Sequence, residues 1–248
     1  MSNTDNAIPA TLKAAIYPNA PGPQFPEMVN ARYDPNSAIL GVSFSGGGPR
    51  AFCCAHGQMA AIASAGLLSD IGAISCVSGG TWFGSLFSYA DSSISDADLF
   101  GPITTADPGT LTQSKIGSVP SDCLLWPVQN ANNENILISV AAYELLREID
   151  GDDAYPWSGL YSFLVNSLFC LPFALADAKT SYTIDGVMGA SGTSLNDVPT
   201  YKLRADRPFL IANATLLWPY QTNDNLQRFE FTSLYSGMTT EIAANPTG

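Results

Sequence analysis

Basic residues are scarce in this sequence, and charged residues of either sign are few. Lys plus Arg total 10 and Asp plus Glu total 22, so the formal net charge is −12 and charged side chains make up 13% of the 248 residues. Proteins that bind nucleic acid neutralise phosphates with basic side chains, and basic segments also dock proteins on anionic membranes. The composition therefore argues against both kinds of partner, and it leaves open a neutral or zwitterionic lipid surface held by apolar contact.

Long hydrophobic runs and targeting signals are missing as well. The most apolar stretch, 160–176, is interrupted by polar residues and a proline, which fits a buried or interfacial helix better than a membrane span. The first residues form neither a basic nor an apolar region, so the sequence predicts no secretory signal and a cytoplasmic location. A hydrophobic fraction of 46% at this length still predicts a folded core.

Cysteine and histidine give little chemistry to build on. The five cysteines are an odd number without C-x-x-C spacing, which predicts neither a disulfide framework nor a zinc site, and we expect buried thiols. The one histidine, His56, lies about two turns into an expected helix, past a glycine-rich turn. Catalytic groups of α/β proteins gather at strand ends, so we interpret His56 as a structural residue.

The order of the expected elements predicts an α/β domain. The first 37 residues are rich in Pro, Asn and Ala and are expected to form an arm before a domain over 38–248. That domain begins with an apolar strand, a helix of small residues, a second strand and a second helix, over 38–44, 49–68, 71–77 and 79–90. Two strands joined by a helix form a right-handed parallel unit, so we expect a doubly wound core with a mainly parallel sheet.

The pattern after residue 90 is less regular. We expect a surface excursion, two helices, a polar stretch rich in turns and two core strands, over 91–117, 133–149, 157–176, 177–206, 208–217 and 228–232. The glycosylation sequon at Asn213 lies in the first of these strands, so we interpret it as a chance match. The aromatic residues of the second helix have helical spacing, so we expect them in the core, with the lining of a lipid channel as the alternative: Trp82, Phe83, Phe87 and Tyr89.

A serine between small residues follows the second strand, in Cys76-Val77-Ser78-Gly79-Gly80. A hydrolase exposes its nucleophile on such a strand-to-helix turn, although many of these elbows have glycine where this chain has Cys76. The Gly79 N–H is then placed to hold an oxyanion at the start of the helix. The alternative is that Ser78 merely caps an ordinary helix.

A glycine-rich turn, Gly46-Gly47-Gly48, follows the first strand. Its free N–H groups are suited to an oxyanion, and we favour that interpretation. The same residues fit G-x-G-x-x-A, and Asp70 lies near the spacing of a ribose-binding acid, so a dinucleotide site is the alternative. Against it, Asp70 precedes the second strand, whereas a ribose acid belongs at the far end of that strand, where Ser78 is found.

The motifs S-G-G-G-P-R-A and V-S-G-G-T-W, about 30 residues apart, resemble those of the patatin-like lipid acyl hydrolases, especially the cytosolic phospholipase A and lysophospholipase branch. The stretches 208–211 and 229–235 are similar to two further segments of that family. The resemblance implies a three-layer α/β/α fold, Ser78 as nucleophile, and oxyanion N–H groups from Gly47 and Gly48. It also implies that Arg50 steadies a substrate phosphate or the oxyanion.

The catalytic aspartate of that family has no clear counterpart in this sequence. A serine activated by a carboxylate does not need histidine, so we expect a Ser/Asp dyad. In the branch that this chain resembles, the aspartate comes well after the last matching segment, so the chain looks like the N-terminal part of a longer catalytic domain. Patatin-like relatives have an Asp-Gly pair closer in, which makes Asp185, and after it Asp150, the alternatives within this chain; forming a turn explains both Asp-Gly pairs equally well.

The function implied by the resemblance is hydrolysis of fatty-acyl esters of phospholipids or lysophospholipids at a membrane or micelle surface. No metal or organic cofactor is implied. Two alternatives stay open: a dinucleotide-binding protein, and a catalytically inactive lipid-binding module that has the serine elbow without its acid.

Overall fold

The computed structural model describes most of the chain between residues 40 and 238. The described residues are 40–102, 109, 112, 114, 117–153, 155–176, 181–183, 187–188, 193–194, 200–217, 226–233 and 236–238. The expected arm therefore lies outside the described residues. No helix in these ranges is both long and apolar enough to cross a membrane.

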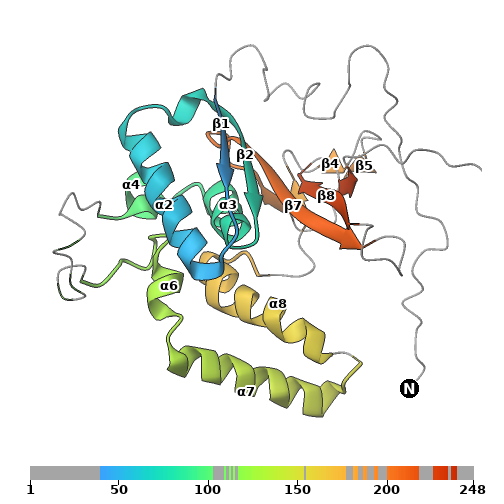
Figure 1. Cartoon of the computed structure of the whole chain (residues 1–248). Coiled ribbons are helices and arrows are strands. Elements are labelled where there is room, and N and C mark those ends of the chain that lie inside the picture. Colours follow the sequence, from blue (N-terminus) through green and yellow to red (C-terminus); the bar gives the residue numbers. More distant parts are fainter. Residues whose placement is uncertain are drawn as a thin grey trace, which may run out of the picture.

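A five-stranded sheet forms the centre of the structure, in the order β1-β2-β7-β8-β9 (Figure 1). β1 and β2 are parallel, β2 and β7 are parallel, and the pairs β7–β8 and β8–β9 are antiparallel, so β8 alone of the five runs against the others. The strands span Leu40–Phe44, Ile71–Val77, Phe209–Leu217, Leu226–Thr232 and Ser236–Met238. The expected core strands are confirmed, and β9 is an addition.

Two long helices pack on one face of this sheet. α2 (Gly48–Ser64) connects β1 to β2, and α3 (Gly79–Tyr89) follows β2. Each crossover moves one strand in the same direction along the sheet, so right-handed connections place both helices on the same side. Three buried rings, from β1, α2 and α3, meet there: Phe83 lies 5.4 Å from Phe44 and 5.9 Å from Phe52, centroid to centroid.

Further helices lie beside the carboxyl ends of the parallel strands (Figure 1). They are α6 (Trp126–Asn130), α7 (Asn133–Asp150) and α8 (Leu160–Val165), while the short α4 (Asp96–Phe100) lies near α2. The remaining described strands are the short β3 (Ser181–Thr183), β4 (Val187–Met188), β5 (Thr193–Ser194) and β6 (Thr200–Lys202). A mixed, mainly parallel sheet flanked by helices confirms the predicted α/β class and fits its three-layer form.

Two helix boundaries differ from the sequence prediction. α2 ends at Ser64 rather than at residue 68, because Gly66 takes a positive φ of 73° that stops the helix, as its glycine suggested. The single helix predicted over 157–176 was wrong. Short helical segments replace it, including a π-helical turn over Asn166–Cys170, and Pro172 prevents a regular continuation because it lacks an N–H.

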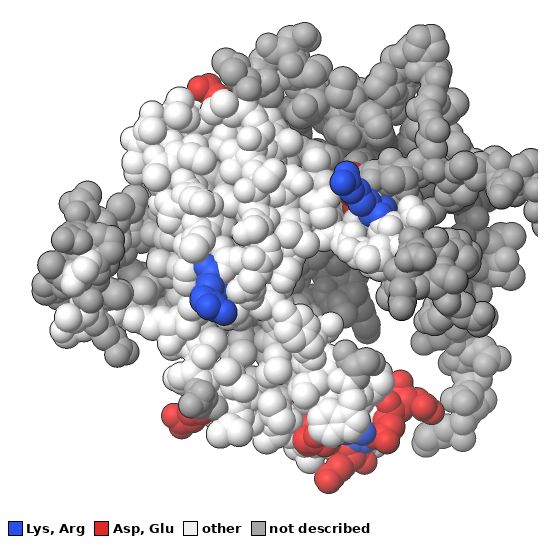
Figure 2. Space-filling model, in the orientation of Figure 1, with Lys and Arg blue, Asp and Glu red and all other residues white. Residues whose placement is uncertain are grey.

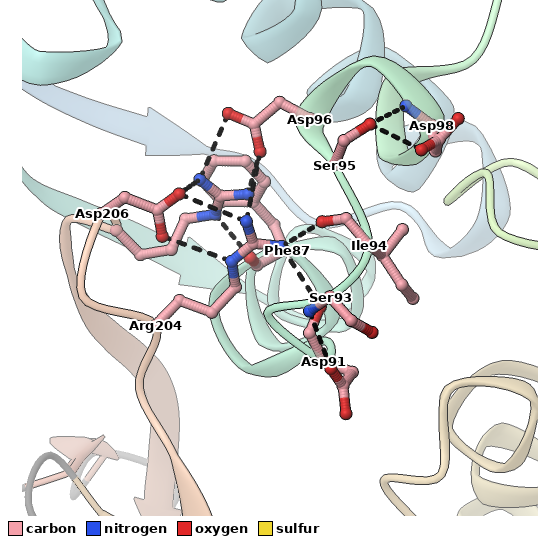
Figure 3. Close-up of polar contacts among 10 residues, drawn as sticks. Phe87, Asp91, Ser93, Ile94, Ser95, Asp96, Asp98, Arg204 and Asp206 are labelled. Atoms are coloured by element: carbon pink, nitrogen blue, oxygen red, sulfur yellow. Dashed lines mark hydrogen bonds and ion pairs between the residues drawn. The ribbon is translucent and has the colours of Figure 1, made fainter.

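Charged residues are sparse over the face of the molecule shown in Figure 2, apart from an acidic group around the far end of α7. A cluster of ion pairs around two buried arginines lies elsewhere, where the C-terminal end of α3 meets α4 and the start of β7 (Figure 3). The fully buried Arg207 side chain pairs with Asp96 and Asp206, and its Nε donates to the Phe87 carbonyl at 2.9 Å. Arg204 joins the cluster through Asp206.

Candidate active site

Two strand-to-helix turns lie against each other at the carboxyl ends of β1 and β2. The strands are parallel neighbours in which Phe44 pairs with Cys76, so the glycine turn after β1 and Ser78 after β2 leave the sheet side by side. A Cβ on Gly46 would lie 3.1 Å from the Ser78 Cβ and 3.7 Å from its Oγ. The structure thus brings the two sequence motifs together.

The backbone at Ser78 has a conformation that L-residues rarely adopt. Its φ is 53° and its ψ −123°, and such a conformation costs about 1–3 kcal/mol unless the surroundings enforce it. The side chain makes no capping bond to the start of α3, so the alternative of an ordinary N-cap is wrong. Ser78 is also exposed, so its hydroxyl is accessible at a sharp turn between a strand and a helix.

Glycine is required at two successive positions on the α3 side of this contact. A Cβ on Gly79 would lie 2.1 Å from the Gly48 carbonyl oxygen, and one on Gly80 would lie 2.8 Å from the carbonyl oxygens of Phe44 and Ser45. These neighbours are backbone atoms that cannot move aside as a flexible side chain would. The two turns therefore pack backbone against backbone, which leaves little room for a pyrophosphate between them and disfavours the dinucleotide alternative.

Several N–H groups around Ser78 lack acceptors among the described residues. Gly47 and Gly48 have φ values of 139° and 60°, and no described carbonyl accepts a bond from either N–H or from that of Gly79. Gly48 and Gly79 are the first residues of α2 and α3, where the N–H groups have no partner within the helix and the potential is positive. This surrounding is suited to an anionic oxygen.

Cys76 lies two residues before Ser78 and is the other nucleophile type in this turn. Its side chain is 1% exposed, and burial raises its pKa to about 12, so the thiol stays protonated and out of reach at neutral pH. A Cβ on Gly84 in α3 would lie 2.8 Å from the Cys76 Sγ. Many elbows have glycine at the position of Cys76. In this chain the residue is a cysteine, and its thiol packs against Gly84 of α3.

The other cysteines only partly follow the prediction of buried thiols. All five are free, and Cys123 is buried like Cys76. Cys54, however, is exposed on α2, and Cys53 and Cys170 are half-buried. No group of three or more His, Cys, Asp or Glu among the described residues is arranged to hold a metal ion.

Arg50 lies in the first turn of α2, just after the glycine turn. Its side chain is exposed and forms no ion pair with any residue that the structure describes. Figure 2 shows an isolated basic patch over the start of α2, surrounded by uncharged surface. A cation at the positive end of a helix gains nothing from the helix dipole, so a local structural reason for Arg50 is missing.

His56 has the structural role predicted for it. The ring is 5% exposed and lies in the core, 6.3 Å from the Phe83 ring and 5.8 Å from the Phe100 ring. Burial lowers its pKa, and the backbone of Leu99 and Phe100 raises it back only in part. The neutral imidazole therefore fills a site between aromatic rings.

The structure does not identify an acid partner for Ser78. No side chain among the described residues hydrogen-bonds its Oγ. Asp70 ends a 3-10 turn directly before β2, at the opposite end of that strand, and Asp150 is the exposed last residue of α7. Asp185 lies outside the described residues.

The aromatic residues of α3 divide into two groups. Phe83, Phe87 and Tyr89 are buried, as predicted for core residues. Trp82, one turn beyond Ser78, is half-buried, and its ring lies 5.0 Å from Phe169 and 6.0 Å from Tyr161, an exposed residue of α8. An apolar surface thus begins one helical turn away from the serine.

Sequence reasoning missed the interaction of Asn213 with the serine strand. Asn213 lies in β7 opposite Val77, and its side-chain Nδ2 donates to the Ser75 Oγ at 2.8 Å and to the Cys76 carbonyl at 3.0 Å. Asn213 thus lies in a strand, as predicted, and this position was the reason for interpreting its glycosylation sequon as a chance match. The missed signal was a lone polar amide in an apolar strand.

Comparisons with known proteins give structural likeness only. No protein-family model matches the chain, and no curated protein matches its sequence. Three solved structures of human GIVD cytosolic phospholipase A2 are similar. The complex with methyl gamma-linolenyl fluorophosphonate and terbium chloride is 15% identical with a TM-score of 0.44, the complex with methyl gamma-linolenyl fluorophosphonate is 17% identical at 0.46, and the third is 18% identical at 0.42.

In each case 82% of this chain is covered, and the chain spans about a quarter of the length of the phospholipase chain: 24%, 24% and 23%. At these identities and TM-scores, we draw nothing from the likeness about the chemistry of this chain.

Proposed function

We propose that the chain carries the nucleophile and oxyanion part of a serine lipid acyl hydrolase that cleaves fatty-acyl esters of phospholipids or lysophospholipids. The observation that carries the proposal is the exposed Ser78 at φ 53°, held against a glycine turn whose N–H groups have no acceptor among the described residues. An ordinary helix start has no need for such a backbone. A hydrolase does, because the turn exposes the hydroxyl beside oxyanion donors.

In this reaction the Ser78 Oγ attacks the ester carbonyl and gives its proton to a carboxylate base. The N–H groups of Gly47, Gly48 and Gly79 hold the negative oxygen, and the base passes the proton to the alcohol part of the lipid as it leaves. Water then gives a proton to the base and attacks the acyl-enzyme, which releases the fatty acid and returns that proton to Ser78. An aspartate outside the described residues completes the proposed Ser/Asp dyad, and Asp185 is the candidate within this chain. Arg50 would neutralise a substrate phosphate or the oxyanion.

The substrate class rests on two supports besides the sequence resemblance. The described surface over the start of α2 is uncharged except for one basic side chain, which suits a lipid with an apolar chain and a phosphate head (Figure 2). The half-buried Trp82 and the exposed Tyr161 extend an apolar surface from the serine. Contact with a neutral or zwitterionic membrane or micelle, and a cytoplasmic location, belong to the same proposal.

A fluorophosphonate probe tests the nucleophile. We expect the wild-type chain to be modified on the peptide that contains Ser78, as detected by mass spectrometry, and Ser78→Ala to remain unmodified. The matched control is Ser64→Ala, because the Ser64 hydroxyl only donates to the Ala60 carbonyl within α2 at 2.8 Å, and this variant should react as the wild type does.

Release of fatty acid from lysophosphatidylcholine micelles tests turnover on the same proteins. Modification of Ser78 without turnover would support the inactive lipid-binding module. Failure of the wild type to react, or equal reaction of Ser78→Ala, would contradict the nucleophile.

A further inference from the structure

The side chain of Asn213 links β7 to the end of β2, directly before the serine turn. Asn213 pairs with Val77 in the parallel register of β7 and β2, one residue before Ser78. Its Nδ2 contacts the Ser75 Oγ at 2.8 Å, the Cys76 carbonyl at 3.0 Å and the Ile211 carbonyl at 3.4 Å. The amide therefore ties down the last residues of β2 from the β7 side.

The elbow is fixed from its other side by the glycine turn after β1. There, Gly46 lies against the Ser78 side chain, and Gly79 and Gly80 lie against backbone atoms of 44–48. The parallel pairing with β1 and β7 holds β2 itself up to its last residues. Asn213 adds a side-chain restraint at that end, because its hydrogen bond to the Cys76 carbonyl holds that peptide two residues before the strained serine.

We propose that Asn213 is a positioning residue that holds the Ser78 elbow in its strained conformation. The proposal rests on the proposed function for its catalytic meaning, and it assigns to Asn213 no contact with substrate. A conformation as unfavourable as that of Ser78 persists only when its surroundings over-determine it. Without the amide, the end of β2 relaxes and the hydroxyl loses its placement beside the N–H groups of Gly47 and Gly48.

Two substitutions separate the hydrogen bond from the volume of the side chain. Asn213→Ala removes the amide, whereas Asn213→Asp keeps the shape but places a carboxylate oxygen against the Cys76 carbonyl, where a donor is needed. The matched control is Asn130→Ala. Asn130 also donates from Nδ2 to a backbone carbonyl, that of Trp126 at 2.9 Å, but both residues belong to α6 and the bond restrains neither β2 nor β7.

The experiment measures fluorophosphonate modification of Ser78 together with amide hydrogen exchange at 75–77, the paired end of β2, at a temperature where circular dichroism shows each variant folded. We expect both Asn213 variants to react about 10- to 100-fold more slowly than the wild type. Exchange at 75–77 should be faster in both by at least about 10-fold. Asn130→Ala should match the wild type in both measurements.

Reaction and exchange rates of both Asn213 variants within twofold of the wild type would overturn the proposal. The two measurements also distinguish the two failures. If the wild type does not react but exchange at 75–77 rises in the Asn213 variants alone, the hydrolase proposal fails while the positioning of the elbow stands. If the wild type reacts and the Asn213 variants behave as it does, the positioning fails and the hydrolase proposal is untouched.

Discussion

The two ends of helix α3 are held by different kinds of interaction. At its N-terminal end, Ser78 and Gly79 pack against the backbone of the glycine turn, with no charged side chain involved in the contacts described. At its C-terminal end, Arg207 caps the Phe87 carbonyl and pairs with two aspartates (Figure 3). One end stores strain in the backbone, and the other satisfies the last carbonyls of the helix with a buried cation.

This difference suggests a division of roles along one helix. An exposed, strained serine in a turn contributes little to folding stability, and strain of this kind persists at functional sites because it serves a reaction. A buried cation with its hydrogen bonds complete does the opposite, because removing it leaves polar groups without partners. Variants at the N-terminal end of α3 should therefore change mainly the rate of Ser78 modification, and variants at its C-terminal end mainly the free energy of unfolding. Each of the following measurements can contradict this difference.

The largest expected effect is at the charged end. Arg207→Ala leaves the Phe87 carbonyl without its donor, leaves Asp96 and Asp206 with Arg204 but without Arg207, and removes the guanidinium that lies 4.2 Å over the Phe87 ring. We expect the free energy of unfolding to fall by about 3 kcal/mol, measured by urea denaturation. The folded fraction should still be modified at Ser78 at the wild-type rate. Exposed Arg228→Ala is the control, with a change within about 0.5 kcal/mol.

If Arg207→Ala slows modification of the folded protein as strongly as a change at the elbow does, the two ends are coupled and the separation fails.

The next effect is at the elbow glycine. Gly79→Ala places a methyl group 2.1 Å from the Gly48 carbonyl oxygen, so one turn must move away from the other. We expect modification of Ser78 to slow by about 100-fold or more, with a loss of about 1–3 kcal/mol in stability. Gly57→Ala is the matched control, because Gly57 is exposed within α2 and its Cβ would meet nothing within 4 Å.

That control should be stabilised by about 0.8–1.0 kcal/mol and react normally, since alanine is the better helix former. Equal behaviour of the two alanine variants would show that the close approach of the two turns is not required.

The smallest effect tests the strain itself. Neither Ser78→Gly nor Ser78→Ala has the hydroxyl, so neither should be modified by the probe. Glycine adopts positive φ without penalty, whereas alanine keeps the strain at φ 53°. We expect the glycine variant to be more stable than the alanine variant by about 0.5–1 kcal/mol, which reverses their usual order within a helix. Thermal or urea unfolding measures the difference, and the usual order would mean that Ser78 carries no strain.

Much of the site was predictable because its signals are local. The order of strand, glycine turn and helix around Gly47, and of strand, serine turn and helix around Ser78, follows from neighbouring residues, and parallel pairing then brings the two turns to one edge of the sheet. The structural role of His56 followed from its place within a helix. The irregular helical run over 157–173 did not follow, because a proline and a π-helical turn interrupt a pattern that reads as one helix.

The missed contacts join residues that are distant in the sequence. Arg207, just before β7, meets Asp96 of α4, and Asn213 reaches β2 from a strand more than a hundred residues later. No local pattern marks such pairs, because the partners depend on which strand lies beside which.

The sequence by itself determined the two turns and the residue types within them, because glycine and a serine between small residues act through local backbone geometry. Only the tertiary structure decided that the serine is strained rather than a helix cap, that the glycine turn packs against it, and that Asn213 and the arginine cluster hold the two sides of this unit. These outcomes depend on the order of the strands in the sheet and on contacts between segments that are distant in the sequence, and both exist only in the folded chain.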